Sequence, residues 1–72
     1  MKVLDATGLL CPLPVLRAQK ALRDMAAGDV IDVLATDKAS VAEFPAFCQQ
    51  TGNELLEWEQ TGGQFRFRLR KA

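Results

Sequence analysis

One cysteine of this 72-residue chain stands in a setting that suits chemistry. Cys11 follows a pair of leucines and precedes Pro12, and Pro14 comes two residues further along. Two prolines so close together stiffen the backbone and limit the directions in which the sulfur can point. A thiol held in this way can act as a nucleophile toward another sulfur atom, provided that something stabilises its thiolate.

The chain contains no histidine, which limits how Cys11 could be activated. A cysteine–histidine catalytic dyad within this chain is excluded. A zinc site of the Cys/His type is excluded too, and two separated cysteines are too few for a thiolate site. We therefore expect neither a metal nor a cofactor, and any activation of Cys11 must come from groups other than imidazole.

A helix is predicted directly after Cys11. Apolar side chains recur at spacings of three and four along one stripe, which consists of Val15, Ala18, Leu22 and Met25. Pro12 and Pro14 suit only the first turn of such a helix, where a missing N–H group is harmless. We therefore expect a helix that begins at residues 12–14 and ends near residue 26.

This helix would place Cys11 at its N-terminus. The N–H groups of a first turn have no acceptor within the helix, and the helix dipole adds about half a positive charge there. We therefore expect the pKa of the Cys11 thiol to fall below its ordinary value of about 8.5. Because prolines carry no N–H group, the expected donors toward the sulfur are Leu13, Val15 and Leu16.

A second helix is predicted over residues 38–51, with Asp37 as its N-cap. Pro45 leaves two alternatives, because either a helix starts at Pro45 after a short turn or one helix bends there. Cys48 falls on the apolar side of this helix, and we interpret it as a core residue. For Cys11, core packing stays open as the alternative to a chemical role, because an isolated free cysteine is often a small buried hydrophobe.

The last 20 residues predict a β-hairpin around Gly62-Gly63, a dipeptide that suits two-residue turns. Apolar and charged side chains alternate on both sides of this turn. The predicted cross-strand pairs are Trp58–Phe67 and Leu56–Leu69 on the inner face, and Glu59–Arg66 and Glu57–Arg68 on the outer face. Phe65 and the other aromatic side chains of the inner face are predicted to be core. Charge pairing also accounts for the arginine stripe, Arg66 to Arg70, better than RNA binding does.

Together with strands over residues 2–5 and 30–36, these elements follow in the order β-α-β-α-β-β. Each strand has at most one strongly apolar face. We therefore predict an α+β fold, an open two-layer α/β sandwich with a four-stranded mixed sheet and two helices on one face. Residues 1–72 would form one domain.

The charge balance and the hydropathy pattern narrow the class of protein. Nine Lys/Arg residues balance nine Asp/Glu residues, and zero net charge argues against a dedicated nucleic-acid binder. The chain has no leader with a basic start and an apolar run, and no apolar run of about 18 residues. We therefore expect a cytoplasmic protein with reduced thiols and no contact with membranes. Nothing in the sequence requires more than a monomer.

The segment LDATGLLCPLPVLRAQKAL resembles the opening of the TusA/SirA-like family of small sulfur carriers. The hallmark of that family is a Cys-Pro-X-Pro motif after a Leu-Asp-X-X-Gly-Leu-X lead. The matching residues are Leu4, Asp5, Gly8, Leu9, Cys11, Pro12, Pro14 and Val15. The similarity extends to the closing aromatic-basic strand and so covers nearly the whole chain. Leu13 fills the variable position of the motif, where members that act in tRNA thiolation often have glutamate.

The resemblance implies that Cys11 carries sulfane sulfur as a persulfide. Gly8, Pro12, Leu13 and Pro14 would shape this site. The sulfur would come from a cysteine desulfurase or a rhodanese-type protein. It would then pass to an acceptor protein in tRNA thiolation, molybdenum cofactor synthesis or sulfur oxidation. In that role the protein is a cosubstrate more than an enzyme.

Arg17 and Lys20 lie on the polar side of the first predicted helix, where they either dock a partner or form a solvated face. Two other classes of function also stay open. One is an adaptor or regulatory binding module that uses the Cys11 loop only as a recognition surface. The other is a redox or metal-handling protein, against which the lack of a nearby resolving cysteine counts. An ordinary thiol pKa with slow alkylation would favour the adaptor.

Overall fold

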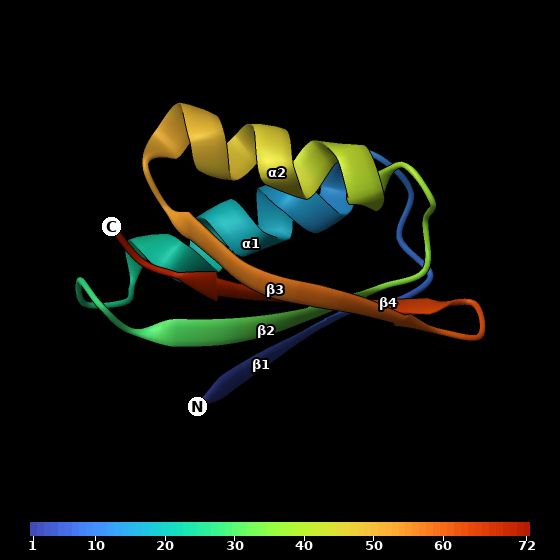
Figure 1. The fold of residues 1–72 in the computed structure, drawn as a ribbon, viewed down its shortest axis with the longest axis horizontal. Coiled ribbons are helices and arrows are strands. Elements are labelled where there is room, and N and C mark those ends of the chain that lie inside the picture. The colour runs from blue at the N-terminus through green and yellow to red at the C-terminus, as the bar shows by residue number, and fades with distance from the viewer.

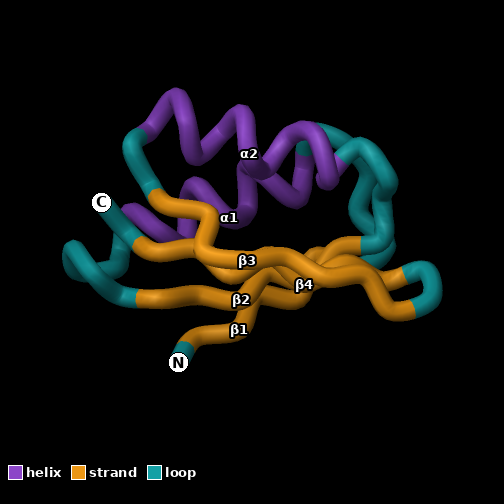
Figure 2. Tube along the Cα trace, in the orientation of Figure 1, coloured by secondary structure: helices purple, strands orange, loops and turns teal.

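The computed structural model describes residues 1–72, and its six elements form one sheet and two helices. In chain order these elements are β1 (Lys2–Ala6), α1 (Leu13–Arg23), β2 (Val30–Ala35), α2 (Ser40–Thr51), β3 (Glu54–Thr61) and β4 (Gln64–Arg70). The strand order is β1-β2-β4-β3, with β1 parallel to β2 and the other pairs antiparallel. Both helices cover the same face of the sheet (Figure 1), and the other face stays open. Figure 2 shows these two layers, which confirm the predicted sandwich.

The core lies between the helices and the inner face of the sheet. Alternate residues of β2 and β4 point into it, as a period of two requires. These buried residues are Ile31, Val33, Ala35, Phe65, Phe67 and Leu69. The helices add Ala18, Leu22, Phe44, Phe47 and Cys48. The ring of Phe44 stacks on that of Phe67 with 4.5 Å between centroids, which ties α2 to the middle of the sheet.

The first helix starts where the sequence predicts but ends earlier. It begins at Leu13 and ends at Arg23, not near residue 26. The N–H groups of Asp24 and Met25 donate to the carbonyl oxygens three residues back, at 3.2 and 3.1 Å. Bonds of this spacing tighten the last turn of a helix and close it.

The second helix runs without interruption through Pro45, so the alternative of a helix that starts at Pro45 is wrong. The missing N–H group costs this helix one hydrogen bond, while the packing of Phe44 holds it against the sheet. Asp37 is not the N-cap either, because that position belongs to Ala39. The Asp37 carboxylate instead accepts the Ala39 N–H at 3.1 Å, within the turn that precedes the helix.

The hairpin has the predicted turn and three of the four predicted pairs. Gly62-Gly63 forms the turn, and the confirmed pairs are Trp58–Phe67, Glu59–Arg66 and Glu57–Arg68. The fourth pair, Leu56–Leu69, is wrong, because Leu55 lies opposite Leu69. A bulge between Leu55 and Glu57 inserts one residue and changes which side chain faces inward. Leu56 is therefore 40% exposed.

Trp58 is not a core residue, in contrast to the prediction. Its ring stacks on Phe67 at a centroid distance of 6.0 Å, yet 44% of the residue is exposed. The reason is the strand order, because β3 is an edge strand that lies beside β4 alone. An indole at such an edge covers the core from outside instead of filling it.

Candidate functional site

Cys11 lies in the loop between β1 and α1, which is fastened to the loop that leaves β2. The Gly8 N–H donates to Oγ1 of Thr36 at 2.9 Å, and the Cys11 N–H donates to Oδ2 of Asp37 at 2.6 Å. Both loops lie at the same end of the sheet (Figure 1), because neighbouring parallel strands end at the same edge. The backbone that carries the sulfur is therefore held by two side chains distant in sequence.

Gly8 allows the chain to reverse after β1. Its φ of +79° lies in the left-handed region that side chains disfavour. A Cβ added there would meet nothing within 4 Å, so backbone conformation alone accounts for the glycine. Gly8 thus sets the direction in which the loop approaches Thr36.

The thiol of Cys11 is exposed and donates a hydrogen bond to Oε2 of Glu43, in the first turn of α2. This hydrogen bond is the main reason why the pKa of the Cys11 thiol is raised; desolvation and the negative charges of Glu43 and Asp37 add to it. The expected lowering of the thiol pKa is therefore wrong. The hydrogen bond to Glu43 and the charges of the two carboxylates favour the neutral thiol over the thiolate.

The first turn of α1 offers the sulfur no N–H group. The Leu13 N–H donates to the Leu10 carbonyl at 2.9 Å, and the Leu16 N–H donates to the Pro12 carbonyl at 3.1 Å. The third expected donor, the Val15 N–H, does not reach the sulfur either. The prediction of backbone donors is therefore wrong as well, because the turn around the two prolines uses the N–H groups of Leu13 and Leu16 for its own hydrogen bonds.

Exposed leucines precede and follow Cys11 along the chain. Leu10, Leu13 and Leu16 are 71%, 45% and 50% exposed, and we call these three residues the leucine rim. Of the two prolines of the motif, Pro12 is exposed and Pro14 is buried against the core. The loop is thus anchored at Pro14 and exposes apolar side chains before and after Cys11 in the sequence.

Arg17 and Lys20 lie on the exposed side of α1, as predicted. Neither forms an ion pair with a carboxylate of the chain. The structure therefore leaves both positive charges available beside the leucine rim.

Cys48 is a core residue, as interpreted from the sequence. It is 5% exposed, and burial raises the pKa of its thiol. The two cysteines are not joined by a disulfide. Cys48 therefore has no access to the sulfur of another protein.

The arginines of β4 all have carboxylate partners on the open face of the sheet. Asp32 accepts two hydrogen bonds from Arg68, at 2.8 and 3.0 Å, and a longer one from Arg66 at 3.4 Å. Arg66 also pairs with Glu59 and Glu57 on β3, and Arg70 pairs with Glu54. Charge pairing thus accounts for the arginine stripe, as predicted.

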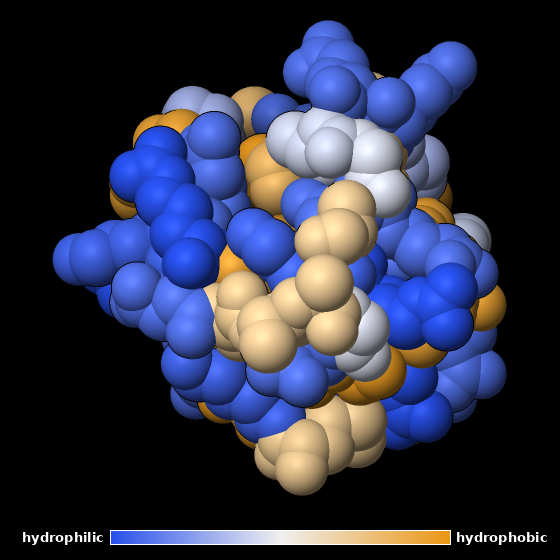
Figure 3. Space-filling view, turned by 90° about the vertical axis from the view of Figure 1, so that its left-hand side faces the viewer, coloured by the Kyte–Doolittle hydropathy of each residue, from blue (hydrophilic) through white to orange (hydrophobic).

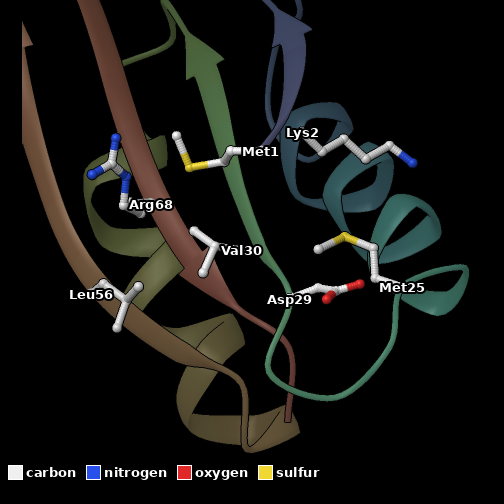
Figure 4. A pocket seen from close by; sticks show the side chains of 7 residues that line it. All are labelled: Met1, Lys2, Met25, Asp29, Val30, Leu56 and Arg68. Carbon is white, nitrogen blue, oxygen red and sulfur yellow. The ribbon is translucent and has the colours of Figure 1, made fainter.

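A pocket of about 550 Å³ lies at the other end of the molecule, where β1 and β2 begin (Figure 4). Its apolar lining includes Met1, Met25 and Leu56, and no cysteine contributes to it. Figure 3 shows this end of the molecule, where moderately hydrophobic residues form a band between hydrophilic ones. The structure holds no cluster of three or more residues that could bind a metal ion. Neither helix has the length and apolarity needed to cross a membrane.

Two carboxylates at the Cys11 loop, those of Asp37 and Glu43, were not predicted from the sequence to lie there. The position of Asp37 near Cys11 was predictable in part. Asp37 follows β2 and the Cys11 loop follows β1, and these two strands are parallel neighbours whose ends lie at the same edge of the sheet. Glu43 had no comparable signal, since only the packing of α2 beside the Cys11 loop brings it to the sulfur. The other predicted site residues, Gly8, Pro12, Leu13 and Pro14, all lie in or next to this loop.

Comparison with known proteins gives a consistent result. The profile of a family described as sulfurtransferase TusA matches residues 2–71. The sulfur carrier protein TusA of Allochromatium vinosum is 55% identical over 69 residues, which cover 96% of this chain and 91% of that protein. The sulfur carrier protein TusA of Pseudomonas putida is 44% identical, with 96% and 86% covered. The crystal structure of a SirA-like protein from Desulfitobacterium hafniense superposes with a TM-score of 0.80 at 33% identity, and covers 97% of this chain and 96% of that one.

Proposed function

The chain belongs to the TusA sulfurtransferase family of sulfur carriers, and from that premise we propose that Cys11 is the residue that carries the sulfur, as a persulfide. One observation carries this assignment. Cys11 is exposed on a fastened loop, whereas Cys48 is buried in the core. Of the two thiols, therefore, only that of Cys11 can meet the sulfur of another protein.

The transfer requires no oxidant and no cofactor. Sγ of Cys11 attacks the terminal sulfur of a donor persulfide and forms a new S–S bond. The S–S bond of the donor breaks, its electron pair stays on the donor sulfur, and that sulfur leaves as a thiol once it has taken up the proton of Cys11. In the second half of the cycle an acceptor thiol attacks the outer sulfur on Cys11 in the same way. The protein is then a cosubstrate that is regenerated.

The surface around Cys11 supports docking to protein partners. The leucine rim supplies apolar contact area, and Arg17 and Lys20 supply unpaired positive charge on one side of it. We therefore propose that a cysteine desulfurase or a rhodanese-type protein approaches over the leucine rim with an acidic flank toward α1. The acceptor would be a protein of tRNA thiolation, molybdenum cofactor synthesis or sulfur oxidation.

Two free thiols suit a reducing compartment, and we place the protein in the cytoplasm on that ground. Fractionation of cells, followed by detection of the protein in the cytosolic fraction, tests this placement. Recovery in an exported or membrane fraction would contradict it.

A loading experiment tests the role of Cys11. The protein is incubated with a cysteine desulfurase and cysteine, and its intact mass is measured together with that of Cys11→Ser and Cys48→Ser. The wild type and Cys48→Ser should gain the mass of one sulfur atom, which a reductant removes, and Cys11→Ser should not. A sulfur adduct that persists in Cys11→Ser would refute the assignment.

One observation favours a second candidate, a non-catalytic adaptor that uses the Cys11 loop only for recognition. The raised pKa of the Cys11 thiol means that little thiolate is present at neutral pH. An adaptor would bind its partner equally well with Cys11→Ser and would take up no sulfur. The loading experiment therefore separates the two functions.

A further inference from the structure

The thiol of Cys11 has a specific partner for its proton. It donates to Oε2 of Glu43, and this is the hydrogen bond that the Cys11 side chain makes within the chain. The carboxylate reaches the sulfur from α2, whereas the sulfur itself stands before α1. A group that touches the nucleophile in this way meets the first requirement for a general base, which is hydrogen-bond reach of the proton that it must accept.

The second carboxylate near the sulfur is used differently. Both oxygens of Asp37 accept backbone N–H groups, from Cys11 at 2.6 Å and from Ala39 at 3.1 Å. These hydrogen bonds fasten the loop, and they are also the reason why the pKa of Asp37 is lowered. Asp37 is therefore engaged as a structural anion, and Glu43 is the carboxylate that faces the thiol.

The other oxygen of Glu43 points to the same conclusion. Oε1 is buried and has no hydrogen-bond partner. A buried carboxylate oxygen without a donor costs free energy, so stability does not explain why an acid stands at this position. Neither Glu43 nor Asp37 forms an ion pair with a lysine or arginine of the chain. No cation therefore diverts the Glu43 carboxylate from the thiol.

We propose that Glu43 is the general base of sulfur transfer: it accepts the Cys11 proton while Sγ attacks the donor persulfide, and it then passes that proton to the departing donor sulfur. This inference rests on the proposed function of Cys11 as the carrier. The proton leaves Cys11, resides on the Glu43 carboxyl group and ends on the donor thiol, so atoms and charges balance. In the second half of the cycle Glu43 takes the proton of the acceptor thiol and returns it to Cys11.

The same contact explains how the resting thiol is protected. Glu43 on α2 and Asp37 on the loop are the charged groups that raise the pKa of Cys11, so the free carrier holds a protonated and weakly reactive thiol. Reaction then requires a bound partner whose leaving sulfur can take the proton that Glu43 removes. The arrangement suppresses reaction with small electrophiles and keeps transfer to a docked persulfide possible.

Two rates measured on Glu43→Gln test this proposal. The first is alkylation of Cys11 by iodoacetamide, which reports the thiolate population alone. The second is sulfur loading from a persulfidated cysteine desulfurase, which also requires that a proton be moved. We expect Glu43→Gln to be alkylated faster than wild type at neutral pH and yet to be loaded at least about 10-fold more slowly, because general bases contribute roughly 10²–10⁴-fold to rates.

The matched controls are Glu57→Gln and Glu43→Asp. Glu57 is a carboxylate on β3 that pairs with arginines on the other face of the sheet, so its replacement should leave both rates unchanged. Glu43→Asp keeps a carboxylate and should recover part of the loading rate. If Glu43→Gln does not fold, as judged by circular dichroism, Glu43→Asp still tests the idea through a changed pH profile of loading.

The outcomes separate this inference from the proposed function. If wild type and Cys11→Ser are equally unable to take up sulfur, the carrier role of Cys11 fails and Glu43 has no such role. If wild type is loaded and Glu43→Gln is loaded equally fast or faster, only the general-base role of Glu43 is overturned. Equal alkylation rates in wild type and Glu43→Gln would show that the contact with Sγ is absent in solution, and this too would overturn the inference.

Discussion

The carboxylate of Glu43 accepts a hydrogen bond from the thiol of Cys11, although 32 positions separate the two residues in the chain. The loop after β1 supplies the sulfur, and the first turn of α2 supplies the acid. Because a carboxylate disfavours a thiolate beside it, the thiol is held in its protonated form. The reactivity of this site is therefore set by a contact between two helix starts and not by one helix alone.

The first prediction concerns the pH dependence of Cys11 alkylation. Because Glu43 raises the pKa of the thiol, the rise of the rate with pH should lie at higher pH than that of a free cysteine peptide. Mass spectrometry after timed iodoacetamide pulses measures this rate, and Cys48 should stay unmodified in the folded protein. A curve displaced to lower pH than the peptide would mean that the N-terminus of α1 dominates after all.

The second prediction concerns the anchor of the loop. Asp37→Asn leaves only one side-chain oxygen to accept the N–H groups of Cys11 and Ala39. We expect a measurable loss in the free energy of unfolding, since hydrogen bonds to charged groups are stronger than those to neutral groups. Urea unfolding followed by Trp58 fluorescence measures it. Asp24→Asn, an exposed change without such bonds, is the control, and equal stability of the two variants would contradict the prediction.

The third prediction concerns Asp32, whose pKa is lowered chiefly by its hydrogen bonds with Arg68 and also by the charge of Arg66. A carboxyl with a lowered folded-state pKa stabilises the fold fully above its unfolded pKa of about 3.9 and loses this effect as pH falls through the folded value. Asp32→Asn should therefore lower the free energy of unfolding by about 2–3 kcal/mol at neutral pH. This loss is smaller than that typical of a fully buried ion pair, because both arginines are partly exposed.

The difference between wild type and Asp32→Asn should then shrink in acid, below about pH 4. Chemical unfolding at a series of pH values measures it, with Glu54→Gln as a control for an exposed ion pair. A difference that stays constant down to the lowest pH would argue against the ionised pair.

The fourth prediction concerns the hydroxyl of Ser40. Oγ of this fully buried residue has no hydrogen-bond partner. Because a buried unpaired polar group costs about 1–3 kcal/mol, Ser40→Ala should raise the free energy of unfolding by about 1 kcal/mol. Thermal and urea unfolding of the two proteins measure the change. Loss of stability in Ser40→Ala would show that the hydroxyl does have a partner in solution.

The fifth prediction concerns the turn before Cys11. Gly8→Ala places a Cβ on a residue with φ of +79° and should cost about 1–2 kcal/mol of stability. Gly63→Ala is the matched control, because its Cβ also meets nothing within 4 Å and its φ is not in the left-handed region. Urea unfolding of both variants tests the difference. If both substitutions cost the same, the left-handed conformation of Gly8 is not what stabilises the loop.

Local patterns predicted most of the fold. The alternation around Gly62-Gly63 predicted the turn and the ion pairs of β4, because a strand period of two leaves few registers that bury the aromatic rings. The predicted register was wrong at Leu56, because a bulge adds one residue there and no residue type in this stretch indicates it. The predicted burial of Trp58 was wrong too, because burial depends on which strand forms the edge of the sheet.

Residue types and near-neighbour spacing are enough to identify Cys11 as the candidate nucleophile, to predict the helix that follows it and to exclude a histidine of this chain as its base. Whether the thiol is protonated depends on contacts that only the folded chain makes. Parallel pairing of β1 with β2 brings Asp37 to the Cys11 backbone, and the packing of α2 brings Glu43 to Sγ. The pKa of a side chain depends on the charges within a few ångströms, and only folding places charges from distant positions there.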